Sequence, residues 1–368
     1  MKKIRGIFNV ALPLGLGLAL LAGCGKSSDP LKNGGKITGS ASDAAVEMKI
    51  RWSPTNRYFY RVETTLYNDI VTKTKAVPVA QETTLALEYS LQITRTNVDG
   101  RQQFDLEILS AALDLTRNGE LLVSYDTDNR AFMLDDANFS ETLRNLKGAH
   151  LTCVISSSNV VDCLDGVPAL LARVGGGKPA ALKTVTYLRS AAMLRGMITD
   201  QFFRQLVDWS FFPEDPVRIG GTWPARRQFA TNPMDGGTAA ADLTCVFKGW
   251  QQRGEDKCVV VDFSGKTRGM GKPAKGILGF FSSAKPSQLN GRLWLHGEKG
   301  VPVALLCGHE SSFQYSAARV QAVPPPSASG TNAPAVAPGT NLPAGPTQTL
   351  ATRQFTVIEL LEIGLRSN

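Results

Sequence analysis

Several short patterns in the sequence contain residue types that could perform chemistry, and each lacks a required member. His309 and Glu310 begin a pattern that zinc metallopeptidases continue with a second histidine, but Phe313 stands at that position and the segment alternates like a strand. Because one face of a helix must supply both ligands, we predict no zinc here. Lys178 follows three glycines as in a phosphate loop, but Pro179 replaces the required Ser or Thr.

A calcium loop and the common nucleophile motifs fail in the same way. Asp126 and Asp128 have calcium-loop spacing, but Arg130 takes a ligand position and Ala137 replaces the bidentate glutamate. The chain contains neither Gly-x-Ser-x-Gly nor Cys-x-x-Cys. We therefore predict no catalytic residues, no metal, no cofactor and no enzymatic activity. An envelope hydrolase whose acid and base meet only in the folded chain remains an alternative, because distant residues can converge in space.

Cys24 ends the most apolar run of the chain, and its thiol is a nucleophile that can accept a lipid. A short basic segment, residues 1–5, precedes the uncharged residues 7–22, which is the layout of an export signal. The run ends in "LAGC", which resembles a bacterial lipobox. The resemblance implies a signal peptide over residues 1–23, cleavage before Cys24 and lipidation of its thiol, including acylation of the new amino terminus. An uncleaved N-terminal anchor is the alternative, although the run is short for a membrane span.

The lipobox and the charge balance predict where the protein lies and what it contacts. Gly25 rather than Asp follows the cysteine, which favours the outer membrane of the cell envelope, facing the periplasm or the surface. Loss of residues 1–23 removes three basic residues, so 37 basic and 32 acidic residues leave a net charge of +5. Without a long Lys/Arg block, nucleic acid is not an expected partner. The expected partners are the membrane, through the lipid anchor, and a lipid or another envelope protein.

Five further cysteines lie in a chain that is expected to meet an oxidising compartment. Two short strands flank a turn at 157–159, and Cys163 opposite Cys153 would centre the hairpin there. Cys258 opposite Cys245 would centre a second hairpin on residues 251 and 252. Residues directly opposite in an antiparallel pair lie about 4.5–5.5 Å apart at Cα, within disulfide reach, so we predict these two disulfides. The alternative is that the cysteines are small buried hydrophobes, as expected for the odd one, Cys307.

The hydrophobic pattern predicts a mainly β fold with one amphipathic helix, in which a curved antiparallel meander sheet could form a half-barrel. Alternation is clearest over residues 85–93, and its return strand follows an Asp-Gly turn at 97–100. That strand changes phase near 109–112, which indicates a bulge, and Asn118-Gly119 marks the next hairpin. If the sheet encloses a ligand, its wall is predicted to include Leu85, Leu87, Tyr89, Leu91, Phe104 and Leu106.

The remaining segments divide the chain. Residues 24–46, rich in Gly, Ser and Lys, are predicted to be a flexible tether before a β domain at 47–322. An amphipathic helix is expected at about 185–209, with an apolar row of Leu194, Ile198, Phe202 and Leu206. The uncharged Pro/Ala/Gly-rich residues 323–348 cannot form a core and are predicted to be a disordered loop. Residues 349–368 then supply the final strand, which should pair with the strand near 311–318.

The layout resembles a family of bacterial β-rich lipoproteins that carry a domain of unknown function. The resemblance rests on the order of these segments and on a Pro-x-x-Pro-Val-x-x-Gly-x-x-Trp element, here formed by Pro213, Pro216, Val217, Gly220 and Trp223. It would cover residues 47–365 and implies no reaction and no catalytic residues. The expected function is therefore a lipid-anchored envelope protein with a binding or structural role. A half-barrel that carries lipid or lipoprotein, or a scaffold that docks partners through residues 323–348, are the other binding hypotheses.

Overall fold

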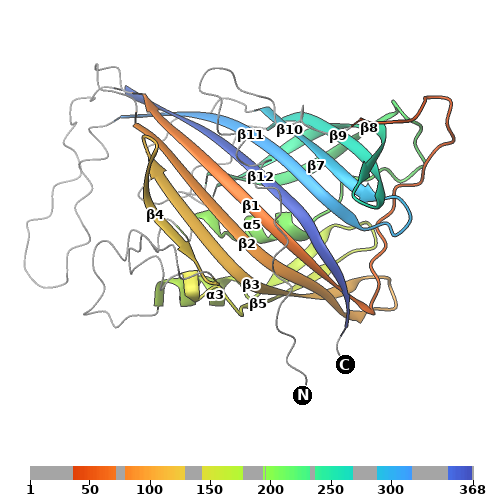
Figure 1. The fold of residues 1–368 in the computed structure, drawn as a ribbon, viewed down its shortest axis with the longest axis horizontal. Coiled ribbons are helices and arrows are strands. Elements are labelled where there is room, and N and C mark those ends of the chain that lie inside the picture. Colours follow the sequence, from red (N-terminus) through yellow and green to blue (C-terminus); the bar gives the residue numbers. More distant parts are fainter. Residues whose placement is uncertain are drawn as a thin grey trace, which may run out of the picture.

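The computed structural model describes residues 36–71, 79–128, 143–176, 194, 196–232, 237–267, 288–316 and 347–366. Within these residues, the fold is a single large antiparallel sheet with two helices on its concave side (Figure 1). The strands are β1 Asn56–Val71, β2 Val79–Thr96, β3 Gln102–Arg117, β4 Glu120–Asp126, β5 His150–Ile155, β6 Val161–Asp165, β7 Thr222–Asn232, β8 Gly237–Arg253, β9 Asp256–Thr267, β10 Gln288–His296, β11 Pro302–Ser316 and β12 Thr347–Leu365. The helices are α3 Val167–Gly176 and α5 Asp200–Val207.

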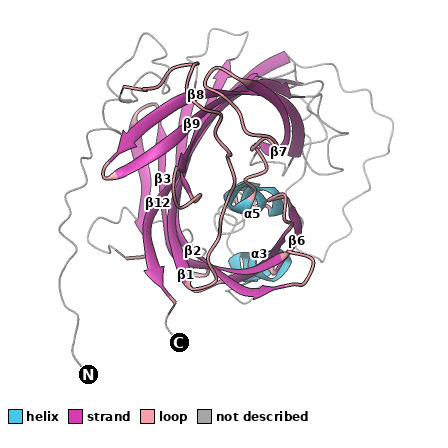
Figure 2. Ribbon diagram, turned by 90° about the vertical axis from the view of Figure 1, so that its right-hand side faces the viewer, coloured by secondary structure: helices cyan, strands magenta, loops and turns pink. Residues whose placement is uncertain are grey.

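The sheet is open and strongly curved, as the sequence predicted. Its strand order is β6-β5-β3-β2-β1-β12-β11-β10-β9-β8-β7, with β4 also paired to β3. Strand β12 lies in the middle, between β1 and β11, so the two ends of the described chain meet in the sheet. The predicted pairing of the final strand with the strand near Ser311 is confirmed by the pair Ser311 and Thr352. Seen from the side, the sheet forms a C that encloses both helices (Figure 2).

Local turn chemistry sets the hairpins where the sequence placed them. Asn118 and Gly119 have φ angles of 51° and 83° between β3 and β4, the conformation of a two-residue hairpin turn that favours Asn-Gly. The predicted change of phase is confirmed, because Glu88 pairs with Ser110 and Tyr89 with Ile108, which leaves Leu109 as a bulge. The bulge restores the apolar residues of β3 to the concave side.

The amphipathic helix is shorter than predicted. Helix α5 covers Asp200–Val207, and its N-cap is Thr199, whose hydroxyl accepts from the Phe202 backbone N–H at 3.1 Å. All four residues of the predicted apolar row are buried, so the predicted face is confirmed. Residues 185–193 and 195 lie outside the described part of the chain. The structure also contains a helix that the sequence pattern did not predict, α3. Its residues Val167, Leu170 and Val174 are buried in the core.

The predicted tether is wrong for its last part. Thr38 and Trp250 exchange two backbone hydrogen bonds, each 2.8 Å long, and Val46 and Val217 exchange two more. Ile37 also packs against a small apolar cluster on the outer side of β9 to β11. Composition alone missed this contact because the partners are far away in the sequence. The predicted disordered loop at 323–348 is wrong for residues 347 and 348, which belong to β12 because they pair with β11. Residues 323–346 and the lipidation residue Cys24 lie outside the described residues.

Candidate functional site

Helix α5 connects the two edges of the open sheet. Arg204 donates from Nη1 to the Val161 carbonyl of edge strand β6 at 3.1 Å, and Gln201 donates from Nε2 to the Gln228 carbonyl of edge strand β7 at 3.0 Å. An ion pair between Arg204 and Asp200, 2.6 Å long, holds the arginine along the helix. The helix therefore acts as a clasp that bridges the gap in the C-shaped sheet (Figure 2).

The last turn of α5 is tied to opposite wings of the sheet. Carbonyls in the last turn of a helix lack partners within the helix and need other donors. The Gln205 carbonyl accepts from Arg227 Nη2 of β7 at 2.8 Å, and the Leu206 carbonyl accepts from the Tyr89 hydroxyl of β2 at 3.3 Å. Adjacent carbonyls of one helix are therefore satisfied by a buried cation on one side and by a neutral phenol on the other.

The apolar face predicted to bind a ligand is a packed core in this structure. All six predicted wall residues have relative exposures of 0–1%. Residues that follow or belong to α5 cover this face: Trp209 lies 6.5 Å from Tyr60, centroid to centroid, and Tyr60 stacks on Tyr89 at 5.6 Å. In this structure helix and loop side chains fill the concavity, so these residues form no open wall, and their contact with a ligand stays a prediction.

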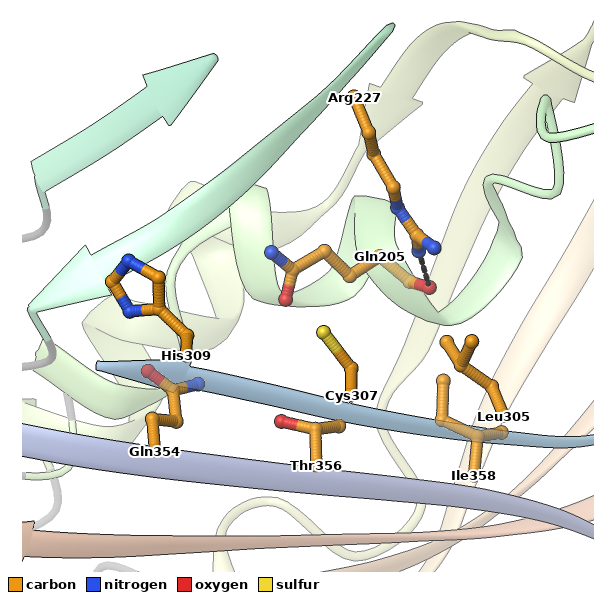
Figure 3. A pocket seen from close by; sticks show the side chains of 8 residues that line it. All are labelled: Gln205, Arg227, Leu305, Cys307, His309, Gln354, Thr356 and Ile358. Atoms are coloured by element: carbon orange, nitrogen blue, oxygen red, sulfur yellow. Dashed lines mark hydrogen bonds between the residues drawn. The ribbon is translucent and has the colours of Figure 1, made fainter. Parts of the chain in front are cut away.

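A small cavity remains where the polar end of the concave face meets α5 (Figure 3). Its volume of about 20 Å³ is enough for roughly one water molecule. Side chains of Cys307 on β11 and Thr356 on β12 project from the sheet toward Gln205 on the helix. The complete lining is Gln205, Arg227, Leu305, Cys307, His309, Gln354, Thr356 and Ile358. The cavity is polar around Arg227 and His309 and apolar at Leu305 and Ile358, which border the filled core.

The electrostatics of this site are those of a dry environment. Arg227 is only 4% exposed, its guanidinium lies 4.4 Å from the Phe211 ring centre, and burial lowers its pKa. Burial also lowers the pKa of His309 to about 4 and raises the pKa of Cys307 to about 12. At neutral pH the site therefore contains a guanidinium beside a neutral imidazole and a neutral thiol.

This combination lacks an activated nucleophile. Cys307 and His309 are neighbouring inward positions on β11, and both border the cavity. A cysteine nucleophile acts as the thiolate and a general base needs a pKa near the working pH, whereas both pKa values here have moved away from that range. Gln354 adds a buried Oε1 with no hydrogen-bond partner within the described structure. The polar side chains of the cavity can hydrogen-bond a polar group of a ligand.

The first predicted disulfide, Cys153 to Cys163, does not form. Ile155 pairs with Val161, which centres the turn as predicted, but the register then shifts and Asp162 is left unpaired. Cys153 therefore lies opposite Leu164 and faces the core, while Cys163 lies on the other face of the ladder. A shift of one residue reverses the face of every following side chain, which is why the two thiols cannot meet.

The second predicted disulfide, Cys245 to Cys258, fails for a different reason. The hairpin turns at Gly254, whose φ of +60° suits glycine, and not at residues 251 and 252. Cys245 pairs with Phe263 inside the curved sheet, and Cys258 belongs to the apolar cluster on the outer side. All five cysteines of the described chain are free thiols, and Cys307 is buried as expected.

The Pro-x-x-Pro-Val-x-x-Gly-x-x-Trp element has a structural position. Val217 pairs with Val46, and Gly220 has a φ of +85° and donates to the Phe247 carbonyl at 2.7 Å. Trp223 Nε1 donates to the Phe211 carbonyl at 2.6 Å, which fixes the segment between α5 and β7. The element therefore holds the aromatic residues that cover the core.

The described residues contain no group of three or more His, Cys, Asp or Glu side chains arranged to hold a metal ion. His150 lies on the outer surface, with its Nδ1 3.0 Å from Asp105. Among the helices of the described chain, none is long and apolar enough to cross a membrane.

Comparison with known proteins does not identify a family. No family profile and no curated protein matches the chain. Among solved structures, lipovitellin aligns over 86% of this chain at 9% identity with a TM-score of 0.44, and this chain spans 26% of that protein. A DUF1329 family protein from Desulfovibrio piger ATCC 29098 aligns over 84% of this chain and 87% of its own, at 10% identity and a TM-score of 0.13. OccAB4 of Acinetobacter baumannii aligns over 84% of this chain and 99% of its own, at 6% identity and a TM-score of 0.14. At these scores the likenesses carry no argument about function.

Arg227 is the functional candidate that sequence reasoning missed. The strand at 222–232 contains Arg226 and Arg227 side by side. Because consecutive strand residues point to opposite faces, one of the two had to face the concave side. That signal was available in the sequence, but the helix carbonyl and the cavity beside Arg227 come from segments far away in the chain.

Proposed function

We propose that this chain is a lipid-anchored, non-enzymatic protein of the cell envelope that binds an amphiphilic ligand between its curved sheet and helix α5. The lipobox at Cys24 supports the anchor, and the outer membrane is the proposed site. The acyl part of the ligand would contact the apolar concave face, and its polar part would lie near the cavity.

One observation carries the binding proposal: α5 bridges the two edge strands of an open sheet through a few side-chain hydrogen bonds. Arg204 and Gln201 attach the helix to β6 and β7, and no strand of the described chain fills the gap between these edges. A continuous sheet would close the gap with a full ladder of backbone bonds. Opening these edges therefore breaks single side-chain bonds rather than a backbone ladder, and the main remaining cost is the loss of the apolar contacts of the buried face of α5.

Binding requires this helix to move. The apolar face is fully covered, so an acyl chain reaches it only by displacing the Phe202, Phe203 and Trp209 side chains. Burial of an acyl chain is worth about 0.8 kcal/mol for each CH₂ group, so a chain of ordinary length can replace the apolar contacts that α5 loses. The structure is then the closed form of the proposed carrier.

The pKa values support a role without catalysis. The thiol and imidazole closest to the cavity are both neutral at pH 7, and neither is poised for covalent or acid–base chemistry. A hydrolase would need one of them shifted in the opposite direction. An activity screen with ester and peptide substrates checks this, and turnover abolished by Cys307→Ser would contradict it.

Photocrosslinking tests the binding proposal. The full-length chain is placed in phosphatidylcholine nanodiscs with a diazirine-labelled fatty acid, and labelled residues are mapped by mass spectrometry. We expect labelling on concave residues such as Leu305 and Ile358. The Gln201→Ala, Arg204→Ala double variant, with a loosened clasp, should label faster, and the exposed Arg61→Ala control should not. Labelling confined to the outer face would overturn the proposal.

Membrane fractionation tests the anchor separately. Cys24→Ala should prevent incorporation of a labelled fatty acid and release the protein from the membrane fraction. Unchanged processing and membrane association of this variant would contradict lipidation at Cys24.

A further inference from the structure

The geometry points to Arg227 as a binding residue for the carboxylate of a single-chain fatty acid, in exchange for the Gln205 carbonyl. This inference rests on the proposed function and adds to it the chemical class of the ligand and the residue that selects it. It is carried by the buried position of Arg227 beside the cavity and by the residues that surround that cavity.

Arg227 and Tyr89 have the same role at the end of α5 but differ in charge. Both side chains donate to a carbonyl in the last turn of α5, and Tyr89 does so as a neutral group. Capping a carbonyl therefore does not require a charge at this place. A buried guanidinium costs several kcal/mol in desolvation unless an anion or good hydrogen bonds compensate. Burial lowers the pKa of Arg227 more than the Asp208 carboxylate raises it, so Asp208 offsets only part of this cost. A cation kept where a neutral donor would suffice indicates a function that uses its charge.

The shape of the Arg227 side chain also suits a carboxylate. The guanidinium presents paired N–H groups in a plane, and these match the two oxygens of a carboxylate. Helix carbonyls near a C-terminus carry partial negative charge, so the Gln205 carbonyl holds the place that a carboxylate oxygen would take. A carboxylate that displaces the Gln205 carbonyl also breaks the hydrogen bond that joins α5 to β7 at Arg227. Binding of the headgroup therefore loosens the helix.

The size and polarity of the cavity also favour a carboxylate. The cavity of about 20 Å³ has room for roughly one water molecule, so two carboxylate oxygens require less enlargement than the four oxygens of a phosphate. Leu305 and Ile358 begin an apolar path from the cavity into the core, where an acyl chain would follow its headgroup. The Thr356 hydroxyl, 3.2 Å from the Thr64 hydroxyl, and the Gln205 side chain supply further polar groups at the same border.

The experiment measures headgroup preference. The full-length chain in phosphatidylcholine nanodiscs is crosslinked to the diazirine fatty acid in the presence of competing oleate, oleyl alcohol, oleyl phosphate or inorganic phosphate. We expect oleate to compete roughly 10- to 100-fold better than oleyl alcohol, the range that a charged hydrogen bond provides. Oleyl phosphate should compete less well than oleate, and inorganic phosphate should have no effect.

Matched variants assign the preference to Arg227. Arg227→Met should reduce the oleate preference to near unity, even if the looser clasp raises total labelling. Arg227→Lys keeps the charge without the planar fork and should retain a reduced preference, which covers the case that the methionine variant does not fold. Arg226→Met, at the neighbouring position whose side chain is 66% exposed, should keep the full preference.

Three results would contradict these proposals, and the experiment distinguishes them. Labelling of the concave residues with equal competition by oleate and oleyl alcohol would overturn the carboxylate site and leave the proposed binding function in place. Equal competition by oleyl phosphate and oleate would show an oxyanion site that does not select by headgroup size, and so would overturn the carboxylate assignment. Absence of concave labelling would overturn both proposals.

Discussion

The two wings of the sheet hold the same helix by different physical means. On the β2 and β3 side, large apolar residues belong to the same buried core as the apolar face of α5, and one phenol caps a helix carbonyl. On the β7, β11 and β12 side, a buried arginine caps the neighbouring carbonyl beside a small polar cavity. The first wing has the composition of a stable core, whereas the second includes polar groups that a core does not need. This difference locates the candidate site, because departures from efficient packing concentrate where a protein functions.

The largest effect is expected in the apolar wing. Phe104→Ala should lower the free energy of unfolding by about 3–5 kcal/mol, because Phe104 is fully buried and packs edge-on against Trp52. Thr356→Val, which keeps side-chain shape beside the cavity, should cost about 1 kcal/mol. Denaturant unfolding followed by fluorescence measures both. Equal costs in the two wings would show that both are packed as stable core.

The next effect is a pH dependence that originates at the cavity. Burial lowers the pKa of His309 to about 4, whereas the unfolded chain has an ordinary value of about 6.5. Between these values only the unfolded state binds the proton, so stability should fall as pH drops from 6.5 to 4, by roughly 3 kcal/mol. His309→Gln should flatten this part of the profile. The exposed His150→Gln control should leave it unchanged, and a steep profile in the His309 variant would contradict the assignment.

A smaller effect should appear in the reactivity of two buried thiols. Cys153 in the apolar wing and Cys307 at the cavity both have a pKa raised to about 12, so their thiolate fractions are matched. If the clasp opens locally, a thiol reagent should modify Cys307 at least about tenfold faster than Cys153. Time-resolved labelling with peptide mass spectrometry measures the ratio, and the more exposed Cys163 is the positive control. Similar rates for the buried pair would indicate that only global unfolding exposes them.

The smallest effect separates the two carbonyl caps. Tyr89→Phe leaves the Leu206 carbonyl without its donor and should cost about 1–3 kcal/mol. Arg227→Met also loses a cap, but it removes the desolvation cost of a buried cation, so we expect a change of less than about 1 kcal/mol. Thermal and denaturant unfolding check both variants. A large loss in the methionine variant would show that Arg227 acts mainly as a structural group.

The sequence was informative wherever the controlling interactions are local. The alternation in β2, the Asn118-Gly119 turn and the apolar row of α5 each depend on neighbouring residues, and each is found in the structure. The disulfides were mispredicted because a single bulge at Asp162 and a turn displaced to Gly254 reverse the faces of the cysteines. Pattern alone does not fix register, since a shift of one residue leaves the local alternation intact.

By itself, the sequence determined a β-rich protein with an antiparallel meander, one amphipathic helix and a final strand that returns to the sheet. Alternation with a period of two and turn residues of restricted φ encode those features within a few positions. The tertiary structure decided that α5 bridges β6 and β7, that the apolar face is covered, and that Arg227 meets the Gln205 carbonyl beside a cavity. These contacts join residues separated by long stretches of chain, and their geometry depends on sheet curvature and register, which arise only when all the strands pack together.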